Sequence, residues 1–194
     1  MNICVFCASS LNIDRKYIDL AAKVGTELAR RGHTLVSGGG SVSCMGAVTS
    51  AARAAGAHTV GVIPQALVDM EVADEESPEL IVTEGMRERK GIMDARSDAF
   101  LVLPGGIGTL EELFEIWCSR VLGIHDRPLV LLDPFGLYDP LKDLVTRMYD
   151  EGFTRPEVFD AISWTSTVEE AFAHLESRTQ PVRPSVAELG EATG

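Results

Sequence analysis

Short apolar runs alternate with longer amphipathic segments along almost the whole chain. The runs have the length and continuity of strands that are buried on both faces of a sheet. The longer segments place apolar residues at helical spacing. The alternation predicts an α/β fold: a doubly wound parallel sheet with helices on both faces. The predicted strands are residues 2–8, 34–37, 58–63, 80–83, 100–103, 128–132 and 162–164, and the predicted helices are residues 17–31, 45–55, 86–97, 110–122, 138–151 and one that begins after a capping box at residues 167–170.

Two segments depart from this alternation. Residues 64–78 carry several acids, Pro78 and no clear period, which predicts a surface loop. Residues 179–194 contain Pro181, Pro184 and small polar residues, which predicts a disordered tail. No linker or internal repeat divides the remainder, so we expect one domain over residues 1–178.

Composition excludes several classes of partner. The net charge of −12 disfavours binding to nucleic acid or to an anionic membrane. No apolar run approaches the roughly 20 residues that a membrane span needs, and the N-terminus lacks the pattern of a signal peptide. We therefore expect a cytoplasmic protein whose pocket is locally positive if its ligand is an anion.

The cysteines and histidines do not predict a metal site, a disulfide framework or a nucleophilic triad. Cys4 and Cys7 form a C-x-x-C pattern, but on a strand residues three apart point to opposite faces. The four histidines are scattered and have no ligand spacing. We expect neither metal nor cofactor.

The strongest local signal is the segment 99–112, in which a buried strand leads into a glycine-rich turn and a helix. Pro104 ends the predicted strand, and Thr109 is the expected N-cap of a helix that begins at Leu110. Unpaired N–H groups and the positive end of a helix dipole converge at such a turn. The segment therefore predicts a phosphate site.

Three predicted strands end in small or glycine-rich turns, after Ala8, Ser37 and Leu103. Ligands of open parallel sheets bind at the carboxyl ends of the strands, so we expect these turns to converge on one rim. Neither glycine cluster completes a Walker A or a dinucleotide fingerprint, which disfavours NAD. For Gly38, Gly39 and Gly40 the alternative is a tight strand-to-helix turn without a ligand.

Charged residues near the predicted phosphate site allow two interpretations each. Glu112 is either the N3 acid of a capping box with Thr109 or a ligand-facing carboxylate, held ionised by the helix N-terminus. The run from Met86 to Lys90 is either a solvated helix face or the source of the local positive field. Arg89 and Lys90 differ by about 100° around a helix, so they need not share a role.

These residues resemble the Lonely-Guy family, the cytokinin-activating phosphoribohydrolases that have been mislabelled as lysine decarboxylases. Residues 104–112 match the motif P-G-G-x-G-T-x-x-E, and Arg89 and Lys90 match the end of M-H-x-R-K. The triple glycine followed by Met45 and Gly46 is similar to the family's G-G-G…M-G turn. Arg87 replaces the usual His, and Ser37 replaces a frequent Tyr.

The resemblance implies a Rossmann-like, nucleotide-binding fold, usually dimeric, that hydrolyses N6-substituted adenosine 5′-monophosphates to the free base and ribose 5-phosphate. By motif position, Arg89 and Glu112 are the expected catalytic pair. In the same way Glu111 lies beside the ribose, and Glu71 is matched to a substrate-contacting acid by spacing alone. The expected substrate-binding residues are Ser9, Gly39, Gly40, Glu71, Met86, Lys90, Gly105, Gly106, Ile107, Gly108, Thr109, Leu110 and Glu111.

Two alternatives to this function stay open at the level of sequence. One is an AMP nucleosidase without a preference for cytokinin nucleotides, and the other is a non-catalytic nucleotide-binding or carrier protein. A lysine decarboxylase would need a lysine that forms a Schiff base with pyridoxal phosphate, and no lysine stands out. The helix over residues 110–122 is strongly apolar, which fits either a homodimer contact or deep burial within the monomer.

Overall fold

The computed structural model describes residues 1–70 and 72–177, and the predicted tail over 179–194 lies outside the described residues. Strands and helices alternate in the order expected from the sequence. The strands are β1 (Asn2–Phe6), β2 (Thr34–Ser37), β3 (Thr59–Pro64), β4 (Glu79–Thr83), β5 (Ala99–Val102), β6 (Leu129–Leu132) and β7 (Ser163–Thr165). The helices are α1 (Arg15–Arg30), α2 (Ser43–Ala54), α3 (Gln65–Val68), α4 (Met86–Ala95), α5 (Ile107–Val121), α6 (Asp139–Asp150), α7 (Glu157–Asp160) and α8 (Val168–Glu176).

The strands form one sheet of seven in the order β4-β3-β2-β1-β5-β6-β7, and every neighbouring pair is parallel. The central strand is β1, whose Ile3 lies opposite Leu35 of β2 and Ala99 of β5. From β1 the chain first builds the sheet in one direction and then returns to add β5 on the other side. This reversal is the topological switch point, where doubly wound sheets bind their ligands.

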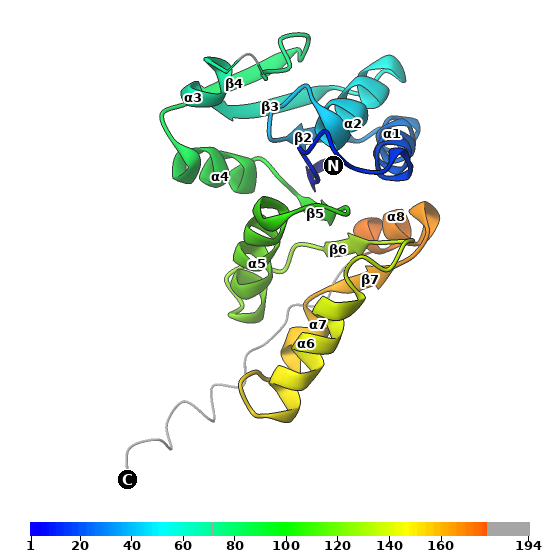
Figure 1. Cartoon of the computed structure of the whole chain (residues 1–194), viewed down its shortest axis with the longest axis vertical. Coiled ribbons are helices and arrows are strands. Elements are labelled where there is room, and N and C mark those ends of the chain that lie inside the picture. The colour runs from blue at the N-terminus through cyan, green and yellow to red at the C-terminus, as the bar shows by residue number, and fades with distance from the viewer. Residues whose placement is uncertain (71, 178–194) are drawn as a thin grey trace.

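Helices form a layer on each face of the sheet, as the sequence predicts (Figure 1), and both layers have apolar cores. Helices α1, α2 and α8 pack on one face, around residues such as Val24, Val48 and Phe172. Helices α4, α5 and α6 cover the other face, around Met93 and Trp117. All of these side chains except Trp117, at 3%, are 2% exposed or less, so both layers belong to a closed core.

Several local predictions are confirmed by the geometry. Cys4 packs in the layer with α4 and α5, whereas Cys7 packs in the opposite layer, so the two thiols lie on different faces. The capping box of α8 is present in both directions between Thr167 and Glu170. Within the described chain no helix is long and apolar enough to cross a membrane.

Two predictions about local structure are wrong. The segment expected to be a loop contains the short helix α3, and Ala73 forms a bridge with Gly40. Helix α5 begins at Ile107 with Gly106 as N-cap, one turn before the predicted start at Leu110. Because Thr109 is therefore inside the helix, its side chain caps nothing. Helix α7 was not predicted, because four residues are too few to show a helical period.

Candidate active site

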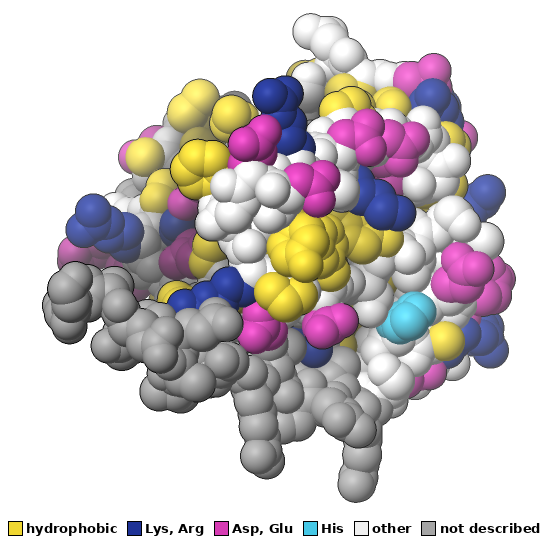
Figure 2. Space-filling model, turned by 90° about the horizontal axis from the view of Figure 1, so that it is seen from below, with side chains coloured by type: hydrophobic (Ala, Val, Ile, Leu, Met, Phe, Trp, Pro, Cys, Tyr) yellow, Lys and Arg dark blue, Asp and Glu magenta, His cyan; other side chains and the backbone are white. Residues whose placement is uncertain are grey.

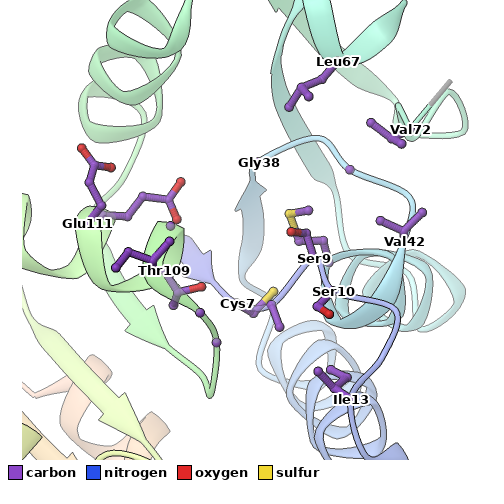
Figure 3. Close-up of a pocket in the computed structure, with 18 of the residues that line it drawn as sticks. Cys7, Ser9, Ser10, Ile13, Gly38, Val42, Leu67, Val72, Thr109 and Glu111 are labelled. Atoms are coloured by element: carbon purple, nitrogen blue, oxygen red, sulfur yellow. The ribbon is translucent and has the colours of Figure 1, made fainter. Parts of the chain in front are cut away.

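A cavity of about 730 Å³ opens at the carboxyl edge of the sheet, at the switch point between β1 and β5. Its lining includes Ser9 after β1, Gly38 and Gly40 after β2, and Gly106 after β5. The predicted convergence of three strand exits on one rim is therefore confirmed. Figure 3 shows Thr109 and Glu111 on one side of the cavity, with Val42, Leu67 and Val72 across from them.

The turn after β5 leaves space beside its backbone. A Cβ atom built on Gly106 or Gly108 would meet no heavy atom within 4 Å. Gly105 differs, because its Cβ would lie 2.2 Å from Oγ1 of Thr109, which is 4% exposed. The first N–H groups of α5, from Ile107 onward, have no acceptor within the helix and lie at this turn. The geometry is that of an anion cradle.

The turn after β2 is closed by its own neighbours. A Cβ on Gly38 would lie 1.9 Å from Nη2 of Arg89, and a Cβ on Gly40 would lie 2.7 Å from the Met45 methyl. Gly39 has a φ of +72°, and its Cβ would lie 2.9 Å from Cβ of Ile63. Glycine is required here so that the protein can approach itself closely.

Arg89 and Glu112 form a buried ion pair beside the cavity. Nη1 of Arg89 donates to Oε1 of Glu112 at 2.8 Å, and its Nε donates to the Val62 carbonyl at 3.0 Å. The two side chains are only 8% and 12% exposed. A capping role for Glu112 is excluded, because α5 begins at Ile107 and no side chain caps it.

The charge state of Glu112 is set by two opposed influences. Burial raises the pKa of Glu112 above its ordinary value, and the neighbouring Arg89 guanidinium lowers it in partial compensation. The sequence-based expectation was a carboxylate held ionised by the helix N-terminus. That cause is wrong, because α5 starts earlier than predicted and places Glu112 beyond the first turn, where the helix dipole has little effect. The Arg89 guanidinium is instead the group that favours the ionised form.

The positive cluster at the start of α4 separates into three environments. Arg89 is buried against Glu112, while Arg87 is exposed. Lys90 pairs with Glu111 and, at 2.7 Å, with Glu115 on the surface of α5. Arg89 and Lys90, which were predicted to have no need of a shared role, thus have different partners.

Most of the predicted substrate-binding residues line the cavity. Three others do not belong to its described lining: Gly39 faces β3, Leu110 packs on the core, and Lys90 is paired on the helix surface. Glu71 lies outside the described residues. The predicted residues that line the cavity are Ser9, Gly40, Met86, Arg89, Gly105, Gly106, Ile107, Gly108, Thr109, Glu111 and Glu112.

One side of the cavity is an apolar wall that was not predicted from the sequence. The segment around α3 is pinned to the triple-glycine turn, because the Ser41 N–H donates to the Val72 carbonyl and the Asp74 N–H donates to the Gly39 carbonyl, both at 2.8 Å. Arg53 holds the same segment through Asp74 at 3.0 Å. The one available signal was that residues 64–78 directly follow a strand exit. The apolar residues missed include Ile13, Tyr17, Val42, Met45, Ile63, Leu67, Met70, Val72 and Leu137.

Few of the described side chains in the cavity could bind a metal or act as a nucleophile. In the described part of the chain no group of three or more metal-ligating side chains is present. None of the described residues that line the cavity is a lysine. The Cys7 thiol is at its floor, but burial raises its pKa well above the ordinary value, so it stays protonated and is a poor nucleophile.

Fold and cavity together define a Rossmann-like α/β protein with an anion cradle and a buried carboxylate–guanidinium pair at its switch point. A family model described as "Possible lysine decarboxylase" matches residues 45–175. Curated relatives identify the family more closely, and the chain belongs to the Lonely-Guy family, whose members are cytokinin riboside 5′-monophosphate phosphoribohydrolases.

The similarity extends over nearly the full length of some relatives. The chain is 50% identical over 169 residues to the cytokinin riboside 5′-monophosphate phosphoribohydrolase of Mycobacterium tuberculosis, covering 87% of this chain and 90% of the relative. It is 42% identical over 174 residues to the enzyme of the same name from Oryza sativa subsp. japonica, covering 90% and 72%.

Solved structures with the same fold include the molybdenum cofactor carrier protein of Chlamydomonas reinhardtii. The TM-score is 0.66 at 22% identity, with 89% of this chain and 93% of that chain covered. At this identity the likeness concerns the fold alone.

Proposed function

We propose that this protein hydrolyses the N-glycosidic bond of N6-substituted adenosine 5′-monophosphates, releasing the free base and ribose 5-phosphate. The observation that carries the proposal is the buried pair of Arg89 and Glu112, placed beside a cavity that has an anion cradle on one side and an apolar wall on the other. Curated relatives that carry the name of this activity support it.

The substrate would bind in an orientation set by its two ends. The 5′-phosphate would accept hydrogen bonds from N–H groups at the start of α5, between Gly106 and Thr109. The base and its N6 substituent would then lie toward the apolar wall that includes Leu67 and Val72. Binding energy from these remote contacts would hold the ribose in place for reaction.

Bond cleavage would develop positive charge on the ribose, in an oxocarbenium-like transition state. The ionised carboxylate of Glu112 would stabilise that charge, orient the attacking water and accept the proton that this water loses, while the departing nucleobase gains a proton from solvent. Arg89 would keep Glu112 ionised in spite of its burial, because its guanidinium lowers the pKa of that carboxyl. In this role Arg89 stays protonated throughout the reaction and transfers no proton to the substrate.

Three rival functions are less well supported. A non-catalytic carrier has no use for a buried acid–base pair beside its ligand. A pyridoxal phosphate decarboxylase would need a lysine in the cavity, and none of the described lining residues is one. A plain AMP nucleosidase uses the same machinery, but it gains nothing from the apolar wall of Val42, Leu67 and Val72.

The direct test is an assay of base release from purified protein. AMP and N6-isopentenyl-AMP would be supplied separately, and free base and ribose 5-phosphate would be quantified by chromatography. We expect stoichiometric release of both products, with a higher kcat/KM for the isopentenyl nucleotide. Equal rates on both nucleotides would indicate an AMP nucleosidase, and nucleotide binding without release would indicate a carrier.

We also propose a cytoplasmic homodimer. Leu113, Ile116 and Trp117 of α5 are buried within the monomer, whereas Phe114 and Leu122 are 39% and 65% exposed. Figure 2 shows, on the face seen from below, a hydrophobic area surrounded by acidic and basic side chains. Such patches on soluble proteins commonly mark contacts between chains. Light scattering in solution decides between monomer and dimer.

A further inference from the structure

Tyr138 connects two strand exits beneath the anion cradle. It lies at the N-cap of α6, it is 5% exposed, and its ring belongs to the apolar layer under α5. Its hydroxyl accepts the Gly105 N–H at 2.8 Å. The same hydroxyl can donate to the carbonyl of Gly105, at 3.1 Å, or of Leu103, at 3.4 Å. One side chain therefore holds both ends of the chain segment that follows β5.

Tyr138 is itself fixed from the next strand. Asp133, which directly follows β6, accepts the Tyr138 N–H through Oδ2 at 2.7 Å and the Phe135 N–H through Oδ1 at 3.1 Å. The neighbouring Leu137 lines the cavity. Because both carboxylate oxygens bind backbone N–H groups, the loop from β6 to α6 is held in one conformation and presents the phenol to Gly105.

The hydrogen bond from the Gly105 N–H to Tyr138 also limits which backbone N–H groups of the turn are available to bind an anion. Its N–H is directed at Tyr138, so the donors left at this turn are those of Gly106 and of the first residues of α5. Burial raises the pKa of Tyr138 to about 12, so the hydroxyl keeps its proton at any pH used for an assay.

We propose that Tyr138 is a positioning residue, which holds the glycine-rich turn after β5 in the shape that binds the substrate's 5′-phosphate. Without the hydroxyl, the Gly105 N–H would lack its partner, and the turn would be ordered only when phosphate binds. The entropy of that ordering would weaken phosphate binding and leave the base and ribose contacts unchanged. The kinetic part of this inference rests on the proposed function.

The test compares Tyr138→Phe with wild type by calorimetric titration of AMP and of adenosine, which lacks the phosphate. We expect the affinity for AMP to fall about tenfold, which corresponds to one hydrogen bond, and that for adenosine to change less than twofold. Tyr149→Phe is the matched control, because Tyr149 lies on the same helix, is 42% exposed, and should change neither affinity. Asp133→Asn should give a smaller loss with the same selectivity for AMP.

Other outcomes are decisive too. Equal losses for AMP and adenosine, or an unchanged affinity for AMP, would overturn the inference. With N6-isopentenyl-AMP, KM should rise about tenfold in Tyr138→Phe while kcat changes less than threefold, whereas general damage to the fold would lower kcat as well. If wild type binds AMP but releases no base, the proposed hydrolysis fails while the titrations still decide the role of Tyr138.

Discussion

The molecule contains two glycine-rich turns that look alike in sequence but differ in what surrounds them. After β2, the Cβ positions of Gly38, Gly39 and Gly40 are already occupied by neighbouring protein atoms. After β5, the Cβ positions of Gly106 and Gly108 have no heavy atom within 4 Å. The first turn is rich in glycine so that the protein can pack against itself. The second keeps its backbone accessible from the cavity, where an anion can reach the N–H groups.

The difference shows that a glycine cluster is not by itself a phosphate site. The turn after β2 contributes through Arg89, whose guanidinium fits against Gly38 and reaches Glu112 from there. The two turns thus divide the work that we propose: one supports the catalytic pair, and the other binds the phosphate. Substitutions of single glycines should separate these two roles.

Among the glycine substitutions, the largest effect is expected from Gly38→Ala. The new methyl group would occupy the position of Nη2 of Arg89, so the guanidinium must move and its 2.8 Å contact with Glu112 is lost. A displacement of this size in a catalytic group lowers turnover about 100-fold, so kcat should fall by that factor with little change in KM. Steady-state kinetics with N6-isopentenyl-AMP measures it.

Gly91→Ala is the control for this variant. Gly91 lies in the same helix as Arg89, and its Cβ would meet nothing within 4 Å. The substitution should leave kcat unchanged and raise the free energy of unfolding by about 0.5–1 kcal/mol, because alanine is the better helix former. A Gly38→Ala enzyme with wild-type turnover would show that turnover does not depend on the position of the Arg89 guanidinium beside Glu112.

A smaller effect, on KM rather than kcat, is expected from Gly106→Ala. The methyl group enters empty space, so the fold is kept, but it stands where the phosphate would approach the α5 amides. Weakening one charge-assisted hydrogen bond should raise KM for the 5′-monophosphate about tenfold. Gly85→Ala is the matched control, since Gly85 is also an N-cap glycine with open space around it. Equal KM values in the two variants would show that the phosphate does not bind at the start of α5.

The last prediction concerns the dependence of the reaction on pH. Burial raises the pKa of Glu112 above its ordinary value of 4.5, and the mechanism that we propose needs the ionised form. As pH falls, kcat should therefore decrease tenfold per unit below a pKa higher than 4.5. The amides of the turn after β5 do not titrate, so no further acid limb comes from them. A kcat that stays constant down to pH 4.5 in folded protein would exclude Glu112 as the carboxylate that accepts the proton of the attacking water.

Much of the sheet could be predicted from sequence because several of its strands are apolar runs, such as Phe100 to Leu103, which Pro104 ends, and Leu129 to Leu132, which follows Pro128. Helix α5 was placed one turn too late because Thr109 has the side chain of an N-cap, whereas the real N-cap, Gly106, has none. Helices α3 and α7 have four residues each, too few for a period to show.

The site was predictable where its residues form a local motif or lie at the end of a predicted strand. The turn after β5 and Arg89 belong to local motifs that the sequence displays, and Ser9 and Gly40 follow predicted strands. The apolar wall is assembled from segments between Ile13 and Leu137, each too short to mark a pocket, and it exists only because the sheet topology joins them. Nor does sequence distinguish the closed turn from the open one, because the atoms that fill the first come from α2, α4 and β3.

The most direct test of the account is single-turnover base release by Glu112→Gln with N6-isopentenyl-AMP, together with the affinity for that nucleotide. The glutamine keeps the size of the side chain and an oxygen for Arg89, but it removes the negative charge that the transition state needs. We predict nucleotide binding within threefold of wild type and base release about 1,000-fold slower. Base release at the wild-type rate would contradict it.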